Sequence, residues 1–294
     1  MLFRSILPSF EIGGAEKVMV TLYNNVEKKN FETFFCVFQD GPLRKKINNH
    51  KNIFFLNKKK ISYGFYDLLK VIYRVGPDII FCTHSHLNAL VCLAKKFKLF
   101  KAKVIIRESN FLSKQQSLSK SFYEKYIVTW FIKNTYSASN HIVCQTKEMM
   151  EDMNYFFHNE NIKKTVIYNP LDFIPEYIVK KTKKTIISIG RLEQQKNQRV
   201  LIEAFDLICH KIPHNLCIIG RGTEFDNLEK LIRSKSLEDR VDLVGFVESP
   251  WDVYQNSSLF VLSSDFEGFP NVIIESMANS TPVKIGRASC RERV

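Results

Sequence analysis

The 294-residue chain lacks the long hydrophobic run that would let a helix cross a membrane. Such a helix needs about 20 consecutive, mostly apolar residues, and the apolar stretches of this sequence are far shorter. We therefore expect no membrane-spanning helix.

Cysteine is also scarce, and the cysteines stand singly at Cys36, Cys82, Cys92, Cys144, Cys209, Cys217 and Cys290. No Cys-x-x-Cys pair or other metal-ligand spacing is present, which argues against a zinc site and a disulfide framework. Isolated cysteines are typical of free thiols in a reducing compartment. The pattern predicts a cytoplasmic protein without a structural metal.

Acidic residues are few relative to basic ones. The sequence has 30 Asp and Glu against 43 Lys and Arg, a formal net charge of +13. A positive surface favours anionic partners, among them nucleotide sugars, lipid diphosphates, anionic membranes and nucleic acid. No recognised nucleic-acid-binding motif accompanies the charge, so we expect no nucleic-acid partner and keep that function only as a remote alternative.

Short β-rich runs alternate with helical patterns, which predicts α/β domains with parallel sheets covered by helices on both faces. We expect strands at 5–10, 32–39, 52–57, 79–84, 103–108 and 141–146, then at 185–190, 215–220, 241–246 and 259–264, with a stub at 281–283. The clearest helices are expected at 14–29, 65–75, 86–100, 200–212, 224–235 and 271–278. Residues 169–184 hold two prolines and four lysines and predict an interdomain linker.

The most informative stretch is SSDFEGFPNVIIESMANS at 263–280, where seven residues separate Glu267 from Glu275. A β-rich run precedes it, and Pro270 is well placed to open a helix. A strand, a tight loop and a helix start form a crevice in which backbone N–H groups can hold a phosphate. One carboxylate could then meet a sugar hydroxyl while the other holds a ribose. Taken alone, two solvated surface glutamates would explain the pair equally well.

Several further motifs accompany this stretch. They are IGGAEKVMVTL (12–22), YNPLD (168–172), IISIGRLEQQKN (186–197), NLCIIGRGTEFDNLEKLI (215–232), VDLVGFVESPWDVYQNSSLFVLSSDFEGFPNVIIESMA (241–278) and TPV (281–283). In this order they resemble a family 4 retaining glycosyltransferase, closest to bacterial transferases of N-acetylamino sugars. The resemblance implies the GT-B fold, in which two Rossmann-like doubly wound domains face each other across a cleft.

The resemblance also implies domain boundaries: an acceptor-side domain at 6–168, a linker at 169–184 and a nucleotide-sugar-binding domain at 185–283. Residues 1–5 and 284–294 resemble in-frame translations of a sequencing adapter, and we leave them out of the fold prediction. Without them the net charge is +9. Members of the family continue beyond TPV, so we expect the second domain to be truncated and this chain to be poorly active.

The resemblance places the donor site in the second domain. Arg191 and Lys196 match cations that contact the donor diphosphate, Glu267 matches the glutamate that reaches the donor sugar, and Glu275 matches the one that binds the ribose. The backbone of Gly268, Phe269, Pro270 and Asn271 would hold the sugar and the phosphates. No Asp-x-Asp metal motif is present, so we expect cationic side chains to neutralise the leaving diphosphate without a metal or any other cofactor.

In the first domain, Gly13 and Gly14 follow the first expected strand, where the resemblance implies a loop close to the donor phosphate. A simple turn is the alternative interpretation of the glycine pair. The candidate sugar or acceptor contacts are Glu16, His84 and Glu108. His84 could equally cap a helix. Glu108 follows Arg107 in a run where many members carry a histidine, and this variation favours an N-acetylhexosamine donor, with UDP as its nucleotide.

Two first-domain stretches, 93–103 and 119–136, interleave lysines with large apolar residues. This pattern is typical of contact with an anionic bilayer, but an ordinary amphipathic helix with solvated lysines would show it too. If the contact is real, a polyprenyl-diphosphate-linked glycan at the inner face of the plasma membrane is a natural acceptor. The leading hypothesis is thus a retaining transferase of surface-glycan synthesis, and a GT-B-fold sugar-nucleotide epimerase is the alternative.

Overall fold

The computed structural model describes residues 2–118, 121–158, 162–171, 184–248 and 250–286. The chain divides into two compact units, unit 1 at Met1–Asp172 and unit 2 at Phe173–Val294. Residues 172–183, most of the predicted linker, lie outside the described residues. The domain boundaries expected from the sequence therefore stay predictions.

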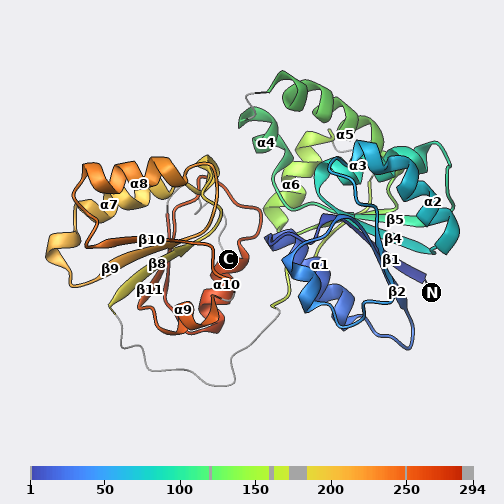
Figure 1. The fold of residues 1–294 in the computed structure, drawn as a ribbon. Helices are drawn as coiled ribbons and strands as arrows, with labels where there is room; N and C mark the ends of the chain where they lie inside the picture. Colours follow the sequence, from blue (N-terminus) through green and yellow to red (C-terminus); the bar gives the residue numbers. More distant parts are fainter. Residues whose placement is uncertain (1, 119–120, 159–161, 172–183, 249, 287–294) are drawn as a thin grey trace. The chain divides into compact units, whose positions relative to one another are not determined.

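Unit 1 is built on one parallel sheet of seven strands (Figure 1), in the order β3-β2-β1-β4-β5-β6-β7. The strands are β1 Leu2–Ser9, β2 Glu32–Gln39, β3 Ile53–Phe55, β4 Ile79–Thr83, β5 Lys103–Arg107, β6 His141–Cys144 and β7 Lys164–Val166. The α-helices are α1 Gly14–Asn25, α2 Phe65–Val75, α3 Ser85–Lys96, α4 Leu112–Leu118, α5 Thr129–Thr135 and α6 Lys147–Phe156. Shorter helical turns are η1 Pro42–Lys46, η2 Ser62–Gly64, η3 Tyr123–Val128 and η4 Tyr136–Ala138.

Apolar residues on both faces of the sheet give unit 1 two cores, as expected for parallel strands covered by helices. One core joins Met19 and Val20 of α1 to Phe35 and Val37 of β2. The other core lies on the opposite face of the sheet. It contains side chains of α2, α3, α5 and α6, among them Leu68 and Val91. The sheet is thereby fixed between its helices, and the loops at its carboxyl edge start from rigid strand ends.

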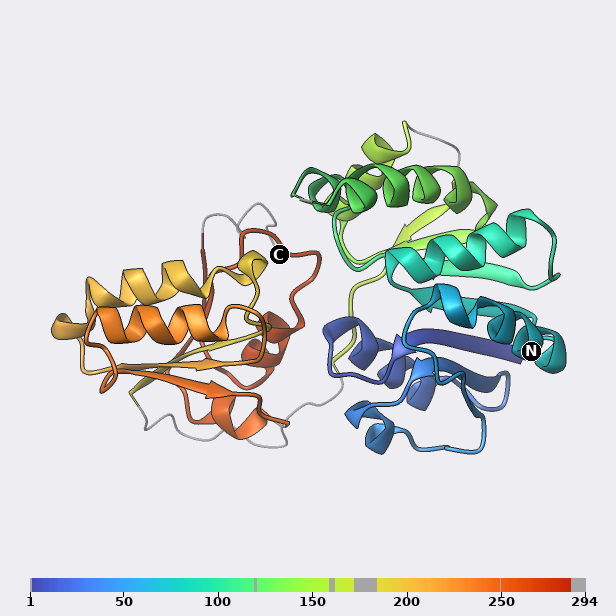
Figure 2. The same ribbon diagram turned by 45° about the horizontal axis from the view of Figure 1, so that its top comes forward.

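Unit 2 repeats this design with five parallel strands in the order β10-β9-β8-β11-β12. They are β8 Thr185–Ile189, β9 Asn215–Ile219, β10 Val241–Gly245, β11 Leu259–Leu262 and β12 Val283–Ile285. Helices α7 Gln198–Asp206 and α8 Phe225–Ser234 lie side by side on one face, and α9 Trp251–Gln255 and α10 Asn271–Ala278 lie on the other (Figures 1 and 2). The turns η5 Gln194–Lys196 and η6 Cys209–Lys211 complete the unit.

Each face of the unit 2 sheet has its own core, one with Ile202 and Ile232 of α7 and α8, the other with Tyr254 and Ile273 of α9 and α10. In both units the strand order reverses direction once. The reversal falls between β1 and β4 in unit 1 and between β8 and β11 in unit 2. Open parallel sheets bind ligands beyond the carboxyl ends of the strands at such reversals.

The structure differs from the sequence-based elements mainly at their ends. Strand β1 begins at Leu2 and β12 ends at Ile285, so both include residues that we had left out of the fold prediction. Strand β7 was not expected, because three residues of which none is fully buried give almost no apolar pattern. The helix expected at 200–212 ends at Asp206, and its last residues form the separate turn η6.

Candidate active site

In unit 1 the reversal of the strand order brings together the loops that follow β1 and β4. Glu16 lies in the first turn of α1, after β1, and His84 stands at the start of α3, after β4. The Glu16 Oε1 and His84 Nε2 atoms are 2.7 Å apart, so the two side chains are hydrogen bonded across the reversal. The fold thus brings together two of the predicted sugar or acceptor contacts, although they are 68 positions apart in the chain.

The backbone around this pair is specialised. His84 has φ 77° and ψ 123°, a conformation that costs a non-glycine residue about 1–3 kcal/mol and that clusters at functional sites. Its main-chain oxygen accepts the hydrogen bond that starts α3, from the N–H of Asn88. The imidazole therefore projects from a fixed turn and does not cap the helix, because its side chain makes no capping hydrogen bond.

Gly13 makes room for the Glu16 carboxylate. A β-carbon at Gly13 would lie 2.1 Å from Glu16 Oε2, well inside the contact distance of the two atoms. The carboxylate folds back over the start of α1, whose first residue is Gly14. The glycine pair thus shapes the loop beside Glu16. That this loop lies close to a donor phosphate stays a prediction.

The third predicted contact, Glu108, lies in the interior of unit 1 and is fully buried. Its carboxylate accepts hydrogen bonds from Ser85 Oγ at 3.1 Å, from Asn88 Nδ2 at 2.9 Å and from the hydroxyl of Tyr136. Burial raises the pKa of Glu108, and these three donors oppose the shift by lowering it. Because Ser85 adjoins His84, Glu108 holds the start of α3 in place.

Arg107 is buried next to it at the end of β5. Its guanidinium donates to Asn169 Oδ1 at 2.6 Å and to Thr83 Oγ1 at 3.3 Å. Burial lowers the pKa of Arg107 to about 10, and the nearby carboxylates of Glu108 and Glu16 oppose this by favouring the charged form. The arginine therefore carries its charge at neutral pH and supports the carboxyl edge of the sheet from within.

In unit 2 the loops after β8 and β11 meet at the corresponding reversal. Lys196 ends η5, after β8, and Glu267 follows β11 in the motif that the sequence singled out. Lys196 Nζ and Glu267 Oε1 form an ion pair, and only 16% and 10% of the two side chains is exposed. Ser264 Oγ donates a further hydrogen bond of 2.5 Å to the same carboxylate oxygen. Two of the three predicted catalytic residues are therefore in direct contact.

Hydrogen bonds fix the two loops to each other beyond this ion pair. Ser263 Oγ donates to the main-chain oxygen of Lys196 at 2.8 Å, and Gln195 Nε2 donates to that of Phe266 at 2.9 Å. The N–H of Asp265 donates to the main-chain oxygen of Gln195 at 2.9 Å. Because these bonds involve main-chain groups, the ion pair sits on a pre-organised frame.

Arg191, the third predicted catalytic residue, is exposed in the loop after β8. Its main-chain oxygen accepts a hydrogen bond of 3.0 Å from Gln198 Nε2, which fixes the backbone of the loop while the guanidinium is left at the surface. Close approach of the neighbouring loop after β9 requires glycine, since a β-carbon at Gly220 would lie 1.8 Å from the main-chain oxygen of Gly190. The guanidinium of Arg191 is thus available to an anionic ligand at the carboxyl edge of the unit 2 sheet.

Glu275 lies in α10, the helix that opens directly after Pro270 as the sequence predicts. Its side chain is buried and accepts a hydrogen bond of 3.0 Å from the hydroxyl of Tyr254 in α9. Burial raises the pKa of Tyr254, and the adjacent carboxylate raises it further, so the tyrosine stays protonated and remains a donor. Tyr254 was not identified from the sequence, although it stands in the quoted motif between β10 and β11.

The residues Gly268, Phe269, Pro270 and Asn271 connect Glu267 to α10. Pro270 is extended, with φ −78° and ψ 99°, and α10 begins at Asn271. The start of a helix presents N–H groups without helical partners, which suits a phosphate or another anion. The structure thus places the predicted donor-binding residues of unit 2 along one loop and one helix start, and their ligand stays a prediction.

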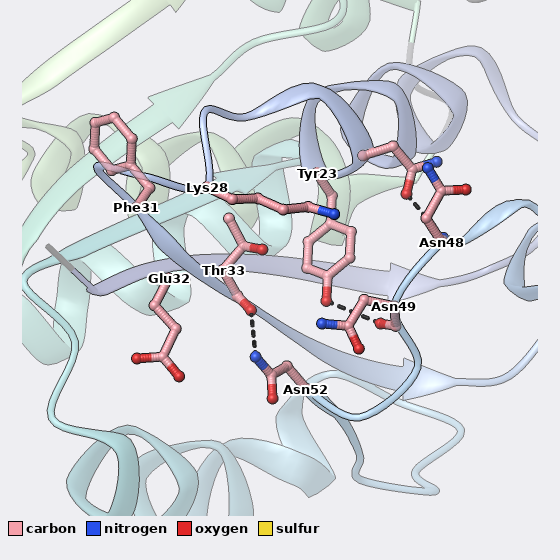
Figure 3. A pocket seen from close by; sticks show the side chains of 9 residues that line it. Tyr23, Lys28, Phe31, Glu32, Thr33, Asn48, Asn49 and Asn52 are labelled. Atoms are coloured by element: carbon pink, nitrogen blue, oxygen red, sulfur yellow. Dashed lines mark hydrogen bonds between the residues drawn. The ribbon is translucent and has the colours of Figure 1, made fainter.

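A pocket of about 200 Å³ lies elsewhere in unit 1. Figure 3 shows its walls, in which Tyr23 Oη donates to the main-chain oxygen of Asn49 and Asn52 Nδ2 donates to that of Thr33. Glu32 and Thr33 begin β2, so the pocket adjoins the amino-terminal edge of the sheet. It is therefore separate from Glu16 and His84, which lie at the carboxyl edge.

Among the residues that the structure describes, no group of three or more His, Cys, Asp and Glu side chains is arranged to hold a metal ion. Within the same residues, each helix is too short or too polar to cross a membrane.

Comparisons with known proteins agree with this architecture. The family model "Glycosyltransferase Family 4" matches residues 12–173, and the model "Glycosyl transferases group 1" matches residues 172–289. The solved structure of HepE from Anabaena in complex with UDP-glucose has a TM-score of 0.78, with 17% identity, and covers 98% of this chain and 81% of that chain. This likeness shows the fold alone, and it confirms the predicted GT-B class of two Rossmann-like units.

Two curated relatives cover most of the chain. One is the N-acetylgalactosamine-N,N'-diacetylbacillosaminyl-diphospho-undecaprenol 4-alpha-N-acetylgalactosaminyltransferase of Campylobacter jejuni, 28% identical over 288 residues, which covers 92% of this chain and 76% of that protein. The other is the lipopolysaccharide 1,6-galactosyltransferase of Salmonella typhimurium, 27% identical over 294 residues, covering 92% of this chain and 75% of that protein. The family models favour a transferase over the epimerase considered above. The chain therefore belongs to glycosyltransferase family 4, whose model matches more than half of it, and residues 172–289 match the group 1 glycosyltransferases, so it is a glycosyltransferase.

Proposed function

We propose that this glycosyltransferase moves an N-acetylhexosamine from a UDP-sugar to a lipid-linked glycan in the synthesis of a surface polysaccharide or glycoconjugate. The proposal includes retention of the anomeric configuration and independence of a divalent metal. The single observation that carries it is the Lys196–Glu267 ion pair at the strand reversal of unit 2. It joins a cation suited to a diphosphate with a carboxylate suited to sugar hydroxyls.

Each predicted donor residue has a chemical role in this proposal. Transfer requires the charge that grows on the leaving diphosphate to be neutralised. Lys196 and the exposed Arg191 supply two cations at the same carboxyl edge of the unit 2 sheet. Glu267 would accept hydrogen bonds from the sugar, while Glu275, held by Tyr254, would accept them from the ribose hydroxyls.

The acceptor side of the proposal uses unit 1. Glu16 and His84 form a hydrogen-bonded pair in which the imidazole is one-third exposed, so it can meet a hydroxyl of the acceptor or of the donor sugar. Glu108 would act indirectly, because its buried carboxylate holds the turn from which His84 projects. A lipid-diphosphate acceptor is supported by the name of the Campylobacter relative and by the excess of basic residues in this chain.

Calorimetric titration of the chain with UDP and with UDP-N-acetylhexosamines tests the donor assignment. Lys196→Gln removes one charge-assisted contact, of a kind that contributes about 1.5–3 kcal/mol. We therefore expect UDP to bind about 10- to 150-fold more weakly. Transfer to a polyprenyl-diphosphate glycan with chelator present then tests the metal-independent reaction.

Unit 2 contains a matched control. Lys235 and Asp206 form another partly buried ion pair, with 2.6 Å between Nζ and Oδ2. Lys235→Gln breaks that pair without touching the predicted donor residues, and UDP affinity should stay unchanged. A folded wild-type chain that binds no UDP, or equal losses in the two variants, would refute the donor assignment.

A further inference from the structure

A row of large apolar side chains is exposed on one segment of unit 1, the π-helical turn η3 with the residues next to it and the first turn of α5. We call this row the aromatic face. Its residues are Phe122, Tyr123, Tyr126, Ile127 and Trp130, and Phe122 and Trp130 are 72% and 64% exposed. Isolated exposed apolar residues are common, but a contiguous row of five marks a contact surface.

The opposite side of the same segment is already packed. Ile132 is buried in the core on the α3 side of the sheet, and Val128 and Phe131 pack against that core. Thr129 and Thr135 are buried as well. The segment is thus apolar on two sides, although one apolar side is enough to pack a helix onto unit 1. Figures 1 and 2 show α5 at the periphery of unit 1, beside α3.

Basic residues flank the aromatic face in the sequence. Between residues 93 and 136 the chain has nine lysines and, apart from the buried Arg107 and Glu108, one other charged residue, Glu124. Lys125 lies within the segment, with its Nζ 5.8 Å from the Tyr126 ring centre. Lys96, at the end of α3, donates to the main-chain oxygen of Asn134 in α5 at 2.8 Å, which brings the lysine-rich end of α3 to this segment.

We propose that the aromatic face docks unit 1 onto an anionic phospholipid bilayer. Tryptophan and tyrosine rings prefer the headgroup level of a membrane, and each nearby lysine contributes attraction to anionic lipid. The concentration of positive charge favours this partner over a second copy of the chain, since two such faces would repel each other. The inference goes beyond the proposed transfer reaction, because bilayer binding requires no sugar nucleotide.

Vesicle binding measured by flotation and by tryptophan fluorescence tests the proposal. The chain has two tryptophans, so a Trp251→Phe background makes Trp130 the only reporter. We expect binding to vesicles that contain phosphatidylglycerol, with emission moving to shorter wavelength, and much weaker binding to pure phosphatidylcholine. Raising the ionic strength from about 0.01 M to 1 M shortens the screening length from about 30 Å to 3 Å and should weaken binding.

The decisive variant is Tyr126→Ala with Trp130→Ala, which we expect to lower partitioning, measured by flotation of the otherwise unchanged chain, at least tenfold. Its control is Tyr66→Ala with Tyr73→Ala on α2, because Tyr66 and Tyr73 are 68% and 67% exposed on another helix of the same unit. Circular dichroism confirms that each variant is folded.

Equal binding by the two double variants, or no binding of the wild-type chain to anionic vesicles, overturns the proposal. So does sedimentation showing that the wild-type chain self-associates through this face and that the Tyr126 and Trp130 variant does not. Since vesicle binding and UDP binding are measured separately, failure of one proposal is distinguishable from failure of the other.

Discussion

Arg4 is a buried cation in the middle of the unit 1 sheet, and its replacement should stabilise the protein. Its side chain is fully buried in β1. Nη1 donates to the main-chain oxygen of Val71 at 2.8 Å, but Nε and Nη2 have no hydrogen-bond partner among the described residues. Burial lowers the pKa of Arg4 because it disfavours the charged guanidinium, and the nearby Cys36 side chain opposes this shift.

These contacts set the expected change in the free energy of unfolding when Arg4 is replaced. A buried donor without a partner costs about 1–3 kcal/mol. The Phe54 ring centre is 5.2 Å from the guanidinium carbon, and this cation–π contact offsets about 0.5–2 kcal/mol of that cost. Replacing a buried ion pair by apolar residues of similar volume is often neutral or stabilises other proteins by about 1–4 kcal/mol, and within the part of the chain that the structure describes Arg4 has no ion-pair partner that its replacement would leave behind. We expect Arg4→Met to raise the free energy of unfolding by a similar amount.

Urea unfolding followed by circular dichroism measures this change, and the midpoint should rise while the slope stays constant. In thermal unfolding, a domain of this size gains about 2–4 °C for each kcal/mol. Arg4→Lys serves as the control, because it keeps the buried charge and should give no gain. A less stable Arg4→Met variant, or an equal gain in Arg4→Lys, would refute the reasoning.

Three further changes test other parts of the structure. Gly220→Ala should destabilise unit 2 by about 1–3 kcal/mol in thermal unfolding, because its β-carbon would lie 1.8 Å from a main-chain oxygen of the loop after β8. Cys209 should react with iodoacetamide before Cys217 when labelling is read by mass spectrometry, since burial raises the pKa of the Cys217 thiol to about 11; faster labelling of Cys217 would contradict this. Tyr254→Phe removes the donor to the Glu275 carboxylate and should weaken UDP binding about 5- to 30-fold in calorimetry, whereas unchanged affinity would show that the hydroxyl does not position Glu275.

The alternating pattern of strands and helices was enough to predict both sheets, because buried parallel strands are short apolar runs between amphipathic helices. Element ends were less predictable. The side chains of β7 show almost no apolar periodicity, and β1 begins at residues that we interpreted as adapter-derived. Arg4 shows why periodicity could not locate that strand end, since a buried arginine in a central strand reads as a polar interruption.

The candidate site was predictable as a set of residues but not as a set of contacts. The motif around Glu267 identified the carboxylate, and the motif after the first strand of unit 2 identified Lys196, yet their ion pair depends on β8 and β11 being neighbours. The same holds for Glu16 and His84, which meet because β1 and β4 are adjacent. Strand order is set by packing between distant segments, which local sequence patterns do not encode.

The described residues of the 119–136 stretch divide between core and surface, and the bilayer contact expected from the sequence stays a prediction. Val128, Phe131 and Ile132 pack against the core as an ordinary amphipathic helix requires. Tyr126 and Trp130 are exposed on the other side. A helix that is apolar on two sides has little net hydrophobic periodicity. The sequence pattern therefore could not tell which apolar residues lie in the core and which are exposed.

The contacts of Glu267 suggest how one carboxylate can serve both Lys196 and a sugar. A lysine ammonium has three N–H donors, so Lys196 can turn one toward a diphosphate without giving up all contact with Glu267. Ser264 donates to the same carboxylate oxygen from within the loop, at 2.5 Å. If the lysine moves toward phosphate, the serine still holds the carboxylate, and its second oxygen remains available to a sugar hydroxyl. In the proposed reaction, this hydrogen bond would keep Glu267 in place while the diphosphate leaves.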